Sequence, residues 1–146
     1  MPPKPISEKV LVMADPLCPV REIMSRGAIS VDEKLTLRSL AAVLTELDIG
    51  VALVARQDNS VGVASERDVV RALANGADPD EVWAGDVMIE DLVLAEPQET
   101  VVAVAERMAS ELVRHVAVVE RGMIVGVVSA HDVVPVLSEY ARATLS

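Results

Sequence analysis

Short runs of β-branched and aliphatic residues alternate along this chain with longer segments whose apolar residues recur at spacings of three and four. The short runs favour strands over helices. They are residues 51–55, 61–64, 115–119 and 123–128. The longer segments predict amphipathic helices. They are residues 36–48, 66–75, 99–112 and 129–143. The pattern therefore predicts an α+β fold in which helices cover small sheets.

Each helical segment has an apolar face that we expect to be buried. In 36–48, which Thr36 caps, that face comprises Leu37, Leu40, Ala41, Leu44 and Leu47. In 66–75 it comprises Val69, Val70, Leu73 and Ala74. In 99–112 it comprises Val101, Val104, Ala105, Met108 and Leu112. Gly50 and Gly76 are expected to end the first two helices.

The remaining segments predict turns and brief extended pieces. Polar residues 57–60 and the pair Arg121–Gly122 each favour a hairpin turn. Short helical turns, which we call the lead-in turns, are expected at 19–24 and 82–88, and extended segments at 28–31 and 92–95. Residues 1–18 hold four of the eight prolines and predict a tail, with one helical turn at Ser7–Ala14.

The second half of the chain repeats the first. Residues 61–70 (VGVASERDVV) recur as 125–134 (VGVVSAHDVV), an offset of 64 (125 minus 61). The same offset aligns Met24 with Met88 and Thr36 with Thr100 without any insertion. The chain is therefore a tandem repeat. We place the first β-α-β-β-α unit at 19–79 and the second at 80–146, related by a pseudo-twofold axis. Because a half of about 60 residues buries little surface alone, we expect the halves to share a core.

Composition and charge narrow the range of functions. Apolar residues make up 51% of the chain, yet there is one Trp, one Tyr and no Phe, so the core must be aliphatic. A net charge of −10 disfavours nucleic acid and anionic membranes as partners. No apolar run reaches the roughly 18 residues of a membrane span. The N-terminus lacks the pattern of a signal peptide, and Cys18 has no second cysteine to pair with, so we expect a cytoplasmic protein.

Neither catalysis nor a metal site is predicted. The sequence contains no P-loop, no Gly-x-Gly-x-x-Gly and no nucleophile elbow. Cys18, His115 and His131 lack the spacing of a zinc site.

Two Ser-x-x-Asp motifs, Ser65 to Asp68 and Ser129 to Asp132, follow the second strand of each predicted hairpin. Such motifs are capping boxes, which stabilise a helix by ~1 kcal/mol without any ligand. The same groups also suit a nucleotide, because a carboxylate can accept two hydrogen bonds from a vicinal diol and a helix N-terminus attracts phosphate. The residues alone leave both interpretations open.

From Pro19 to Tyr140 the chain resembles the cystathionine-β-synthase (CBS) domain pair, or Bateman module. The hallmark Gly-hydrophobic-x-(Ser or Thr)-x-x-Asp is present as GVASERD (62–68) and GVVSAHD (126–132). Supporting features are the lead-in turns VREIM (20–24) and GDVM (85–88), and the strand RHVAVV (114–119). Ala117 departs from the family, which frequently has Pro there.

The resemblance implies a sensor that binds adenosine-containing ligands such as AMP, ADP, ATP, S-adenosylmethionine or NAD in clefts between the repeats. The hallmark Asp would bind the ribose hydroxyls, the Ser would lie near ribose or phosphate, and the first extended segment would contact the base. One site would then use Asp68 and Ser65 with the segment from Ile29 to Val31. The other would use Asp132 and Ser129 with the segment from Val93 to Ala95. Arg67 and Arg71 would meet phosphate at one cleft, and His131 stands in the matching place at the other.

Two functions follow from the resemblance. The first is a regulatory module that senses an adenosyl ligand, requires no cofactor for chemistry and signals through a conformational or assembly change to a protein in trans. The second is a ligand-free pair that serves for dimerisation or protein interaction. A homodimer is expected in both cases, with helices 36–48 and 99–112 supplying its surface.

Overall fold

The computed structural model describes residues 15–26 and 29–145. The helical turn expected at Ser7–Ala14 lies outside these residues. The chain divides into two compact units, which are described separately. Among the described residues, the central unit holds 29–92, and the terminal unit combines 15–26 with 93–145.

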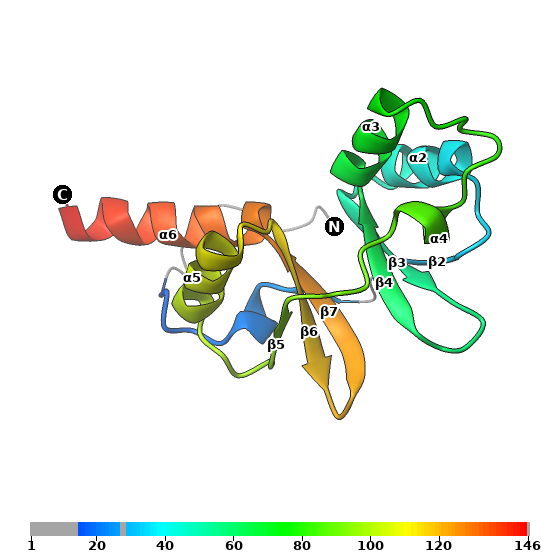
Figure 1. Ribbon diagram of the computed structural model, residues 1–146. Coiled ribbons are helices and arrows are strands. Elements are labelled where there is room, and N and C mark those ends of the chain that lie inside the picture. Colours follow the sequence, from blue (N-terminus) through cyan, green and yellow to red (C-terminus); the bar gives the residue numbers. More distant parts are fainter. Residues whose placement is uncertain (1–14, 27–28, 146) are drawn as a thin grey trace, which may run out of the picture. The chain divides into compact units, whose positions relative to one another are not determined.

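The central unit is built on a three-stranded sheet of order β2-β3-β4 (Figure 1). Its strands are β2 (Ser30–Asp32), β3 (Val51–Ala55) and β4 (Val61–Ser65). Strand β2 runs parallel to β3, and β3 and β4 form an antiparallel hairpin. Its helices are α2 (Leu37–Glu46), α3 (Glu66–Ala74) and the single turn α4 (Ala84–Val87). Helices α2 and α3 are in contact with each other.

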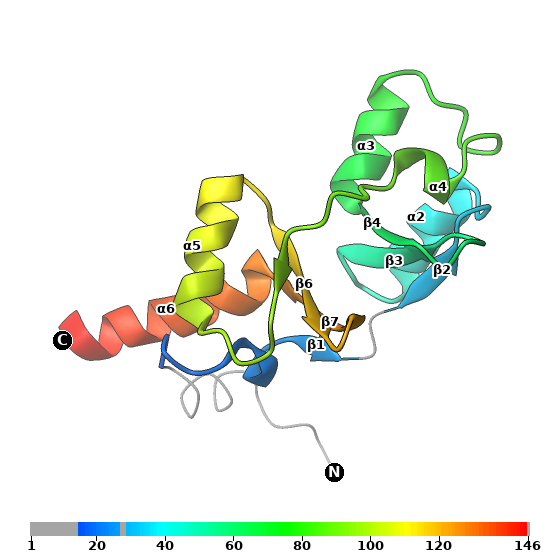
Figure 2. The same ribbon diagram turned by 60° about the horizontal axis from the view of Figure 1, so that its bottom comes forward.

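The terminal unit has the same plan with one more strand (Figure 2). Its sheet has the order β1-β7-β6-β5. The strands are β1 (Ser25–Arg26), β5 (Leu94–Ala95), β6 (His115–Glu120) and β7 (Met123–Ser129). The helices are the 3₁₀ turn η1 (Val20–Glu22), α5 (Val101–Glu111) and α6 (Ala130–Leu145). Arg121 and Gly122, with φ of 54° and 77°, form the expected turn between β6 and β7.

These elements confirm the predicted α+β fold and the repeated β-α-β-β-α order. The described residues form two apolar clusters, one in each unit, instead of the single core that we expected. Val54 and Leu40 are fully buried in the central cluster, and Val118 and Val104 in the terminal cluster. Within the part of the chain that the structure describes, no helix is both long enough and apolar enough to cross a bilayer.

Each cluster draws on both sequence repeats because the lead-in turns are exchanged. The segment around α4, from the second repeat, is bound to the central unit: the Ala84 and Gly85 amides donate to the carbonyls of Leu35 and Glu33 at 2.7 and 2.9 Å. In the terminal unit the Val20 amide donates to the Glu99 carbonyl at 2.7 Å. The compact units therefore do not coincide with the sequence repeats.

Several residues that we predicted to face the core are exposed instead. On α3, Val70 is 64% and Leu73 is 47% exposed, and only one narrow face of this short helix, centred on Val69, is covered. Leu47 and Leu112 are 51% and 89% exposed. Both lie at the C-terminal cap of their helix, where the backbone leaves the helical path. Helix α2 ends through Asp48, with φ of 52°, before Gly50 is reached.

Candidate ligand-binding sites

The first Ser-x-x-Asp motif lies where β4 passes into α3. The Ser65 amide and hydroxyl both donate to Asp68 Oδ2, at 2.8 and 2.9 Å. The Asp68 amide donates back to Ser65 Oγ at 3.3 Å, which completes the capping box. Asp68 is 8% exposed, and among the described residues it is the charged residue that is buried. The capping interpretation is therefore correct for this motif, and it leaves Oδ1 outside the cap's hydrogen bonds.

The second motif, between β7 and α6, has the same local geometry. The Ser129 amide and hydroxyl donate to Asp132 Oδ2 at 2.8 and 3.0 Å. Asp132 is half-buried rather than buried. In both motifs one carboxylate oxygen is held by the serine, which fixes the direction of the other.

The two motifs differ in the charges around them. Arg71 Nη1 lies 3.7 Å from Asp68 Oδ1, whereas the residue equivalent to Arg71 in the second repeat is Pro135 (135 minus 71 is 64). Arg67 and His131, at equivalent positions in the first turns of α3 and α6, are both exposed. The first motif is thus accompanied by two arginines, Arg67 and Arg71, whereas the second has His131 and Pro135 at the equivalent positions.

Each motif shares one end of its sheet with the first extended segment of that unit. Ser65 is opposite Val51 at the start of β3, and the parallel strand β2 begins at Ser30, opposite Leu53. The Glu66 amide donates to the Gly50 carbonyl, and the Leu53 amide to the Ile29 carbonyl. Ile29 and the motif therefore lie at the same end of the sheet, on opposite sides of β3.

The terminal unit repeats this register. Ser129 is opposite His115, and β5 begins at Leu94, opposite Ala117, whose amide donates to the Val93 carbonyl. The predicted contact residues differ in exposure: Ile29 is 38% exposed, Val31 and Val93 are half-buried, and Ala95 is only 3% exposed. Ala95 packs into the terminal cluster, so the surface of this segment is formed by its neighbour Leu94, which is 48% exposed.

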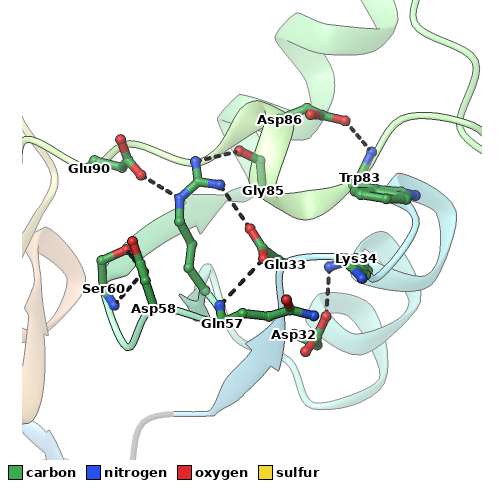
Figure 3. Close-up of polar contacts among 11 residues, drawn as sticks. Asp32, Glu33, Lys34, Gln57, Asp58, Ser60, Trp83, Gly85, Asp86 and Glu90 are labelled. Atoms are coloured by element: carbon green, nitrogen blue, oxygen red, sulfur yellow. Dashed lines mark hydrogen bonds and ion pairs between the residues drawn. The ribbon is translucent and has the colours of Figure 1, made fainter.

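The sequence pattern did not predict the ion pairs that hold the segments containing β2 and β5. After β2, Glu33 accepts from Arg56 Nη1 at 2.8 Å, while Arg56 Nε donates to Glu90 at 2.6 Å and Nη2 lies 3.5 Å from the Gly85 carbonyl (Figure 3). These partners are 23 to 34 residues apart in the chain, so no local pattern predicts the cluster.

A second ion pair supports β5. Arg107 Nη1 donates to the Leu94 carbonyl at 2.8 Å and to Glu99 at 3.1 Å, and Nη2 binds the other Glu99 oxygen. The hydrogen bond from Arg107 holds the pKa of the Glu99 carboxyl below its ordinary value. Among the described residues, no group of three or more His, Cys, Asp or Glu side chains could hold a metal ion.

Comparison with known families identifies the repeated domain. The family profile described as "CBS domain" matches residues 20–75 and again 84–139. The chain therefore belongs to the CBS domain family and carries two copies of the domain.

Three similar proteins place the chain within that family. A CBS domain protein from Pyrobaculum aerophilum, PAE2072, solved in complex with AMP, is 31% identical with a TM-score of 0.73, over 85% of this chain and 98% of that one. Hypoxic Response Protein I, solved with two coordinated zinc ions, is 30% identical with a TM-score of 0.66, over 80% of this chain and 96% of that one. The curated sequence of hypoxic response protein 1 is from Mycobacterium tuberculosis. The uncharacterized protein MJ1225 of Methanocaldococcus jannaschii is 31% identical over 120 residues, which is 82% of this chain but only 42% of that longer protein.

Proposed function

We propose that this protein is a regulatory module that binds an adenosine-containing ligand, with AMP as the first candidate, at its Ser-x-x-Asp motifs. The observation that carries the proposal is the position of Asp68. Its Oδ2 is fixed by Ser65, its Oδ1 is free of the cap, and the adjacent end of the sheet carries the exposed Ile29. A carboxylate held in this way can accept hydrogen bonds from a ribose diol beside an apolar surface for the base.

The AMP complex of the Pyrobaculum aerophilum relative supports the choice of ligand. In this proposal Asp68 and Asp132 bind ribose hydroxyls, and Ser65 and Ser129 orient them. Ile29 and Val31, or Val93 with Leu94, contact the base. Arg67 and Arg71 bind phosphate at the first motif, where His131 is the counterpart at the second. The module performs no chemistry itself, and its output is a change in conformation or assembly that a separate protein detects.

Thermal unfolding with and without millimolar AMP, ADP, ATP, S-adenosylmethionine and NAD tests the proposal. A ligand present at 100 times its dissociation constant stabilises the folded state by about 2.7 kcal/mol. In a domain of this size that raises the unfolding midpoint by several degrees. We expect AMP to produce this shift and Asp68→Ala or Asp132→Ala to abolish or reduce it.

A matched control separates loss of a cap from loss of a site. Asp86 also caps a helical turn, because its carboxylate accepts from the Trp83 amide at 2.8 Å, but it lies outside both motifs. Asp86→Ala should lower the midpoint without ligand and leave the AMP shift unchanged. An AMP shift that is undiminished in the double variant Asp68→Ala/Asp132→Ala would reject the assigned sites.

The alternative is a ligand-free dimerisation or protein-interaction module, and a specific observation favours it. In both motifs the serine and the aspartate are hydrogen-bonded to each other without a ligand, and helices α3 and α6 leave apolar residues exposed at equivalent positions, Val70 at 64% and Val134 at 60%. Absence of any ligand shift, together with a dimer in light scattering that Val70→Asp/Val134→Asp dissociates, would establish this function.

Light scattering also tests the homodimer that we infer under both functions. The helices proposed to supply its surface, α2 and α5, expose Leu47 and Leu112 at their C-terminal ends. Leu47→Asp/Leu112→Asp should dissociate the dimer if that surface is used, whereas Val70→Asp/Val134→Asp should do so if α3 and α6 form it.

A further inference from the structure

The two lead-in segments, residues 20–26 and 84–90, dock on their hairpins in the same register. Ile89 bridges Val63 of β4, and Ser25 pairs with Val127 of β7. The offset of 64 relates both members of these pairs (89 minus 25, and 127 minus 63). Positions 90 and 26, one residue further along, are therefore equivalent positions beside the two hairpins.

In the central unit, position 90 carries a negative charge that forms an ion pair next to the hairpin. Glu90 pairs with Arg56, which directly follows β3, at 2.6 Å, and Arg56 also pairs with Glu33 at 2.8 Å. The Arg56 and Glu33 side chains are 33% and 17% exposed, so this pair is partly shielded from solvent and stronger than one on the open surface. Glu90 is 56% exposed and pairs with the same guanidinium group at the outer side of the cluster.

The sequence inverts both charges in the other repeat. Glu120, at the end of β6, stands at the position equivalent to Arg56, and Arg26 stands at the position equivalent to Glu90 (120 minus 56 and 90 minus 26 are both 64). Pro97 replaces Glu33 (97 minus 33 is 64). If each lead-in segment were to dock on the hairpin of its own repeat, Glu90 would approach Glu120, and Arg26 would approach Arg56.

We propose that these four charges select the exchanged pairing, in which each lead-in segment binds the hairpin of the other repeat. The contact between Met and Gly does not select it, because both segments present Met to a hairpin Gly: Met88 to Gly62, and Met24 to Gly126. Juxtaposed like charges reject a wrong partner even where shape and hydrophobicity are matched. The same rejection acts between two copies of the chain, where mispaired segments would give swapped assemblies.

Reversal of one charge tests the attraction that the proposal places between the charges at positions 26 and 120. Glu120 is exposed, and a surface substitution without a partner changes stability little. We expect Glu120→Arg to lower the thermal midpoint by a few degrees, and the matched variant Glu120→Gln to lower it less. Salt at 1 M should reduce both effects, because it screens the charges. An unchanged midpoint in Glu120→Arg would overturn the proposal.

The double variant Arg26→Glu/Glu120→Arg tests selection separately from stability. It restores opposite charges in the exchanged pairing, so the midpoint should recover, including where Glu120→Arg alone fails to fold. It also makes the wrong pairings attractive, because residue 26 would be acidic opposite Arg56 and residue 120 basic opposite Glu90. After dilution from urea at several protein concentrations, we expect a refolding phase or a dimer that the wild type lacks. Refolding of the double variant with wild-type kinetics to a wild-type assembly would show that the four charges do not select the pairing, and would overturn the proposal.

Discussion

Met88 packs directly on Gly62: a Cβ atom on this glycine would lie 2.8 Å from Met88 Sδ and 2.8 Å from the Ile89 carbonyl oxygen. Gly126 has the same relationship to Met24, at 2.7 Å from Sδ and 2.9 Å from the Ser25 carbonyl oxygen. The hallmark glycine and the methionine of the lead-in turn are separate features in the sequence, but they form one contact in the structure. The glycine is needed for close approach and not for a left-handed backbone.

Gly62→Ala and Gly126→Ala should therefore each destabilise the protein by about 1–3 kcal/mol, the usual cost of overpacking. Urea denaturation measures the change. Gly76→Asn is the control, because nothing lies within 4 Å of a Cβ there and Asn tolerates its φ of 89° better than other residues. Equal losses in all three variants would contradict the close-packing explanation.

The Glu99–Arg107 pair predicts a pH-dependent contribution to stability. Because Arg107 lowers the pKa of Glu99, the pair's contribution is fully present above the ordinary glutamate value of 4.5 and is lost as the pH falls through the lower pKa of the folded state. The difference in thermal midpoint between wild type and Arg107→Gln should thus be constant near neutrality and shrink below pH 4.5.

Arg38→Gln is the matched control for this pH series. Arg38 and Asp80 form an exposed pair, with side chains 65% and 61% exposed, and such pairs contribute little. Its midpoint should stay close to wild type throughout. A Glu99–Arg107 difference that does not depend on pH would show that Arg107 acts through its bond to the Leu94 carbonyl alone.

Leu112 occupies a left-handed backbone conformation, with φ of 57°, and its side chain is 89% exposed. Leu is poorly suited to this region, whereas Asn visits it readily. Leu112→Asn should raise the free energy of unfolding by about 1 kcal/mol, the lower end of the roughly 1–2 kcal/mol that the left-handed conformation costs an ordinary residue. The equivalent residue is Asp48, with φ of 52°, so Asp48→Leu should lower it by a similar amount. A loss of stability in Leu112→Asn would mean that the leucine makes a stabilising contact in an assembly.

The arginines of the first motif should discriminate AMP from adenosine. Arg67→Gln/Arg71→Gln is expected to weaken AMP binding by about 10- to 100-fold, the effect of losing hydrogen bonds between charged groups. Adenosine binding should change little, because the ribose contacts are retained. Calorimetry with both ligands measures the two affinities, and His131→Gln serves as the matched change at the second motif. Equal losses for AMP and adenosine would show that these arginines support the fold of the site rather than bind phosphate.

Much of the fold could be predicted because its signals are local. The strand runs, the hairpin turn at Arg121–Gly122 and the caps at Ser65 and Ser129 depend on residues within a few positions of each other. The buried faces were predicted less well. Val70 and Leu112 have the helical spacing of core residues, but burial depends on which face a neighbouring element covers. The ion pairs of Arg56 and Arg107 could not be predicted either, because their partners are brought together only by the folded sheets.

The sequence by itself determined the tandem repeat, the β-α-β-β-α order and the two Ser-x-x-Asp caps, because periodicity and capping are properties of neighbouring residues. Only the tertiary structure decided that the lead-in turns of the two repeats are exchanged, that the apolar residues form two clusters, and that Asp68 is the more deeply buried of the two motif carboxylates. The physical reason is that each lead-in segment carries the same local pattern, a short helical turn that ends in Met, and each hairpin offers a Gly to that Met. That pattern does not state which hairpin each segment binds, and only the folded structure shows the long-range contacts between them, such as Arg56 with Glu90.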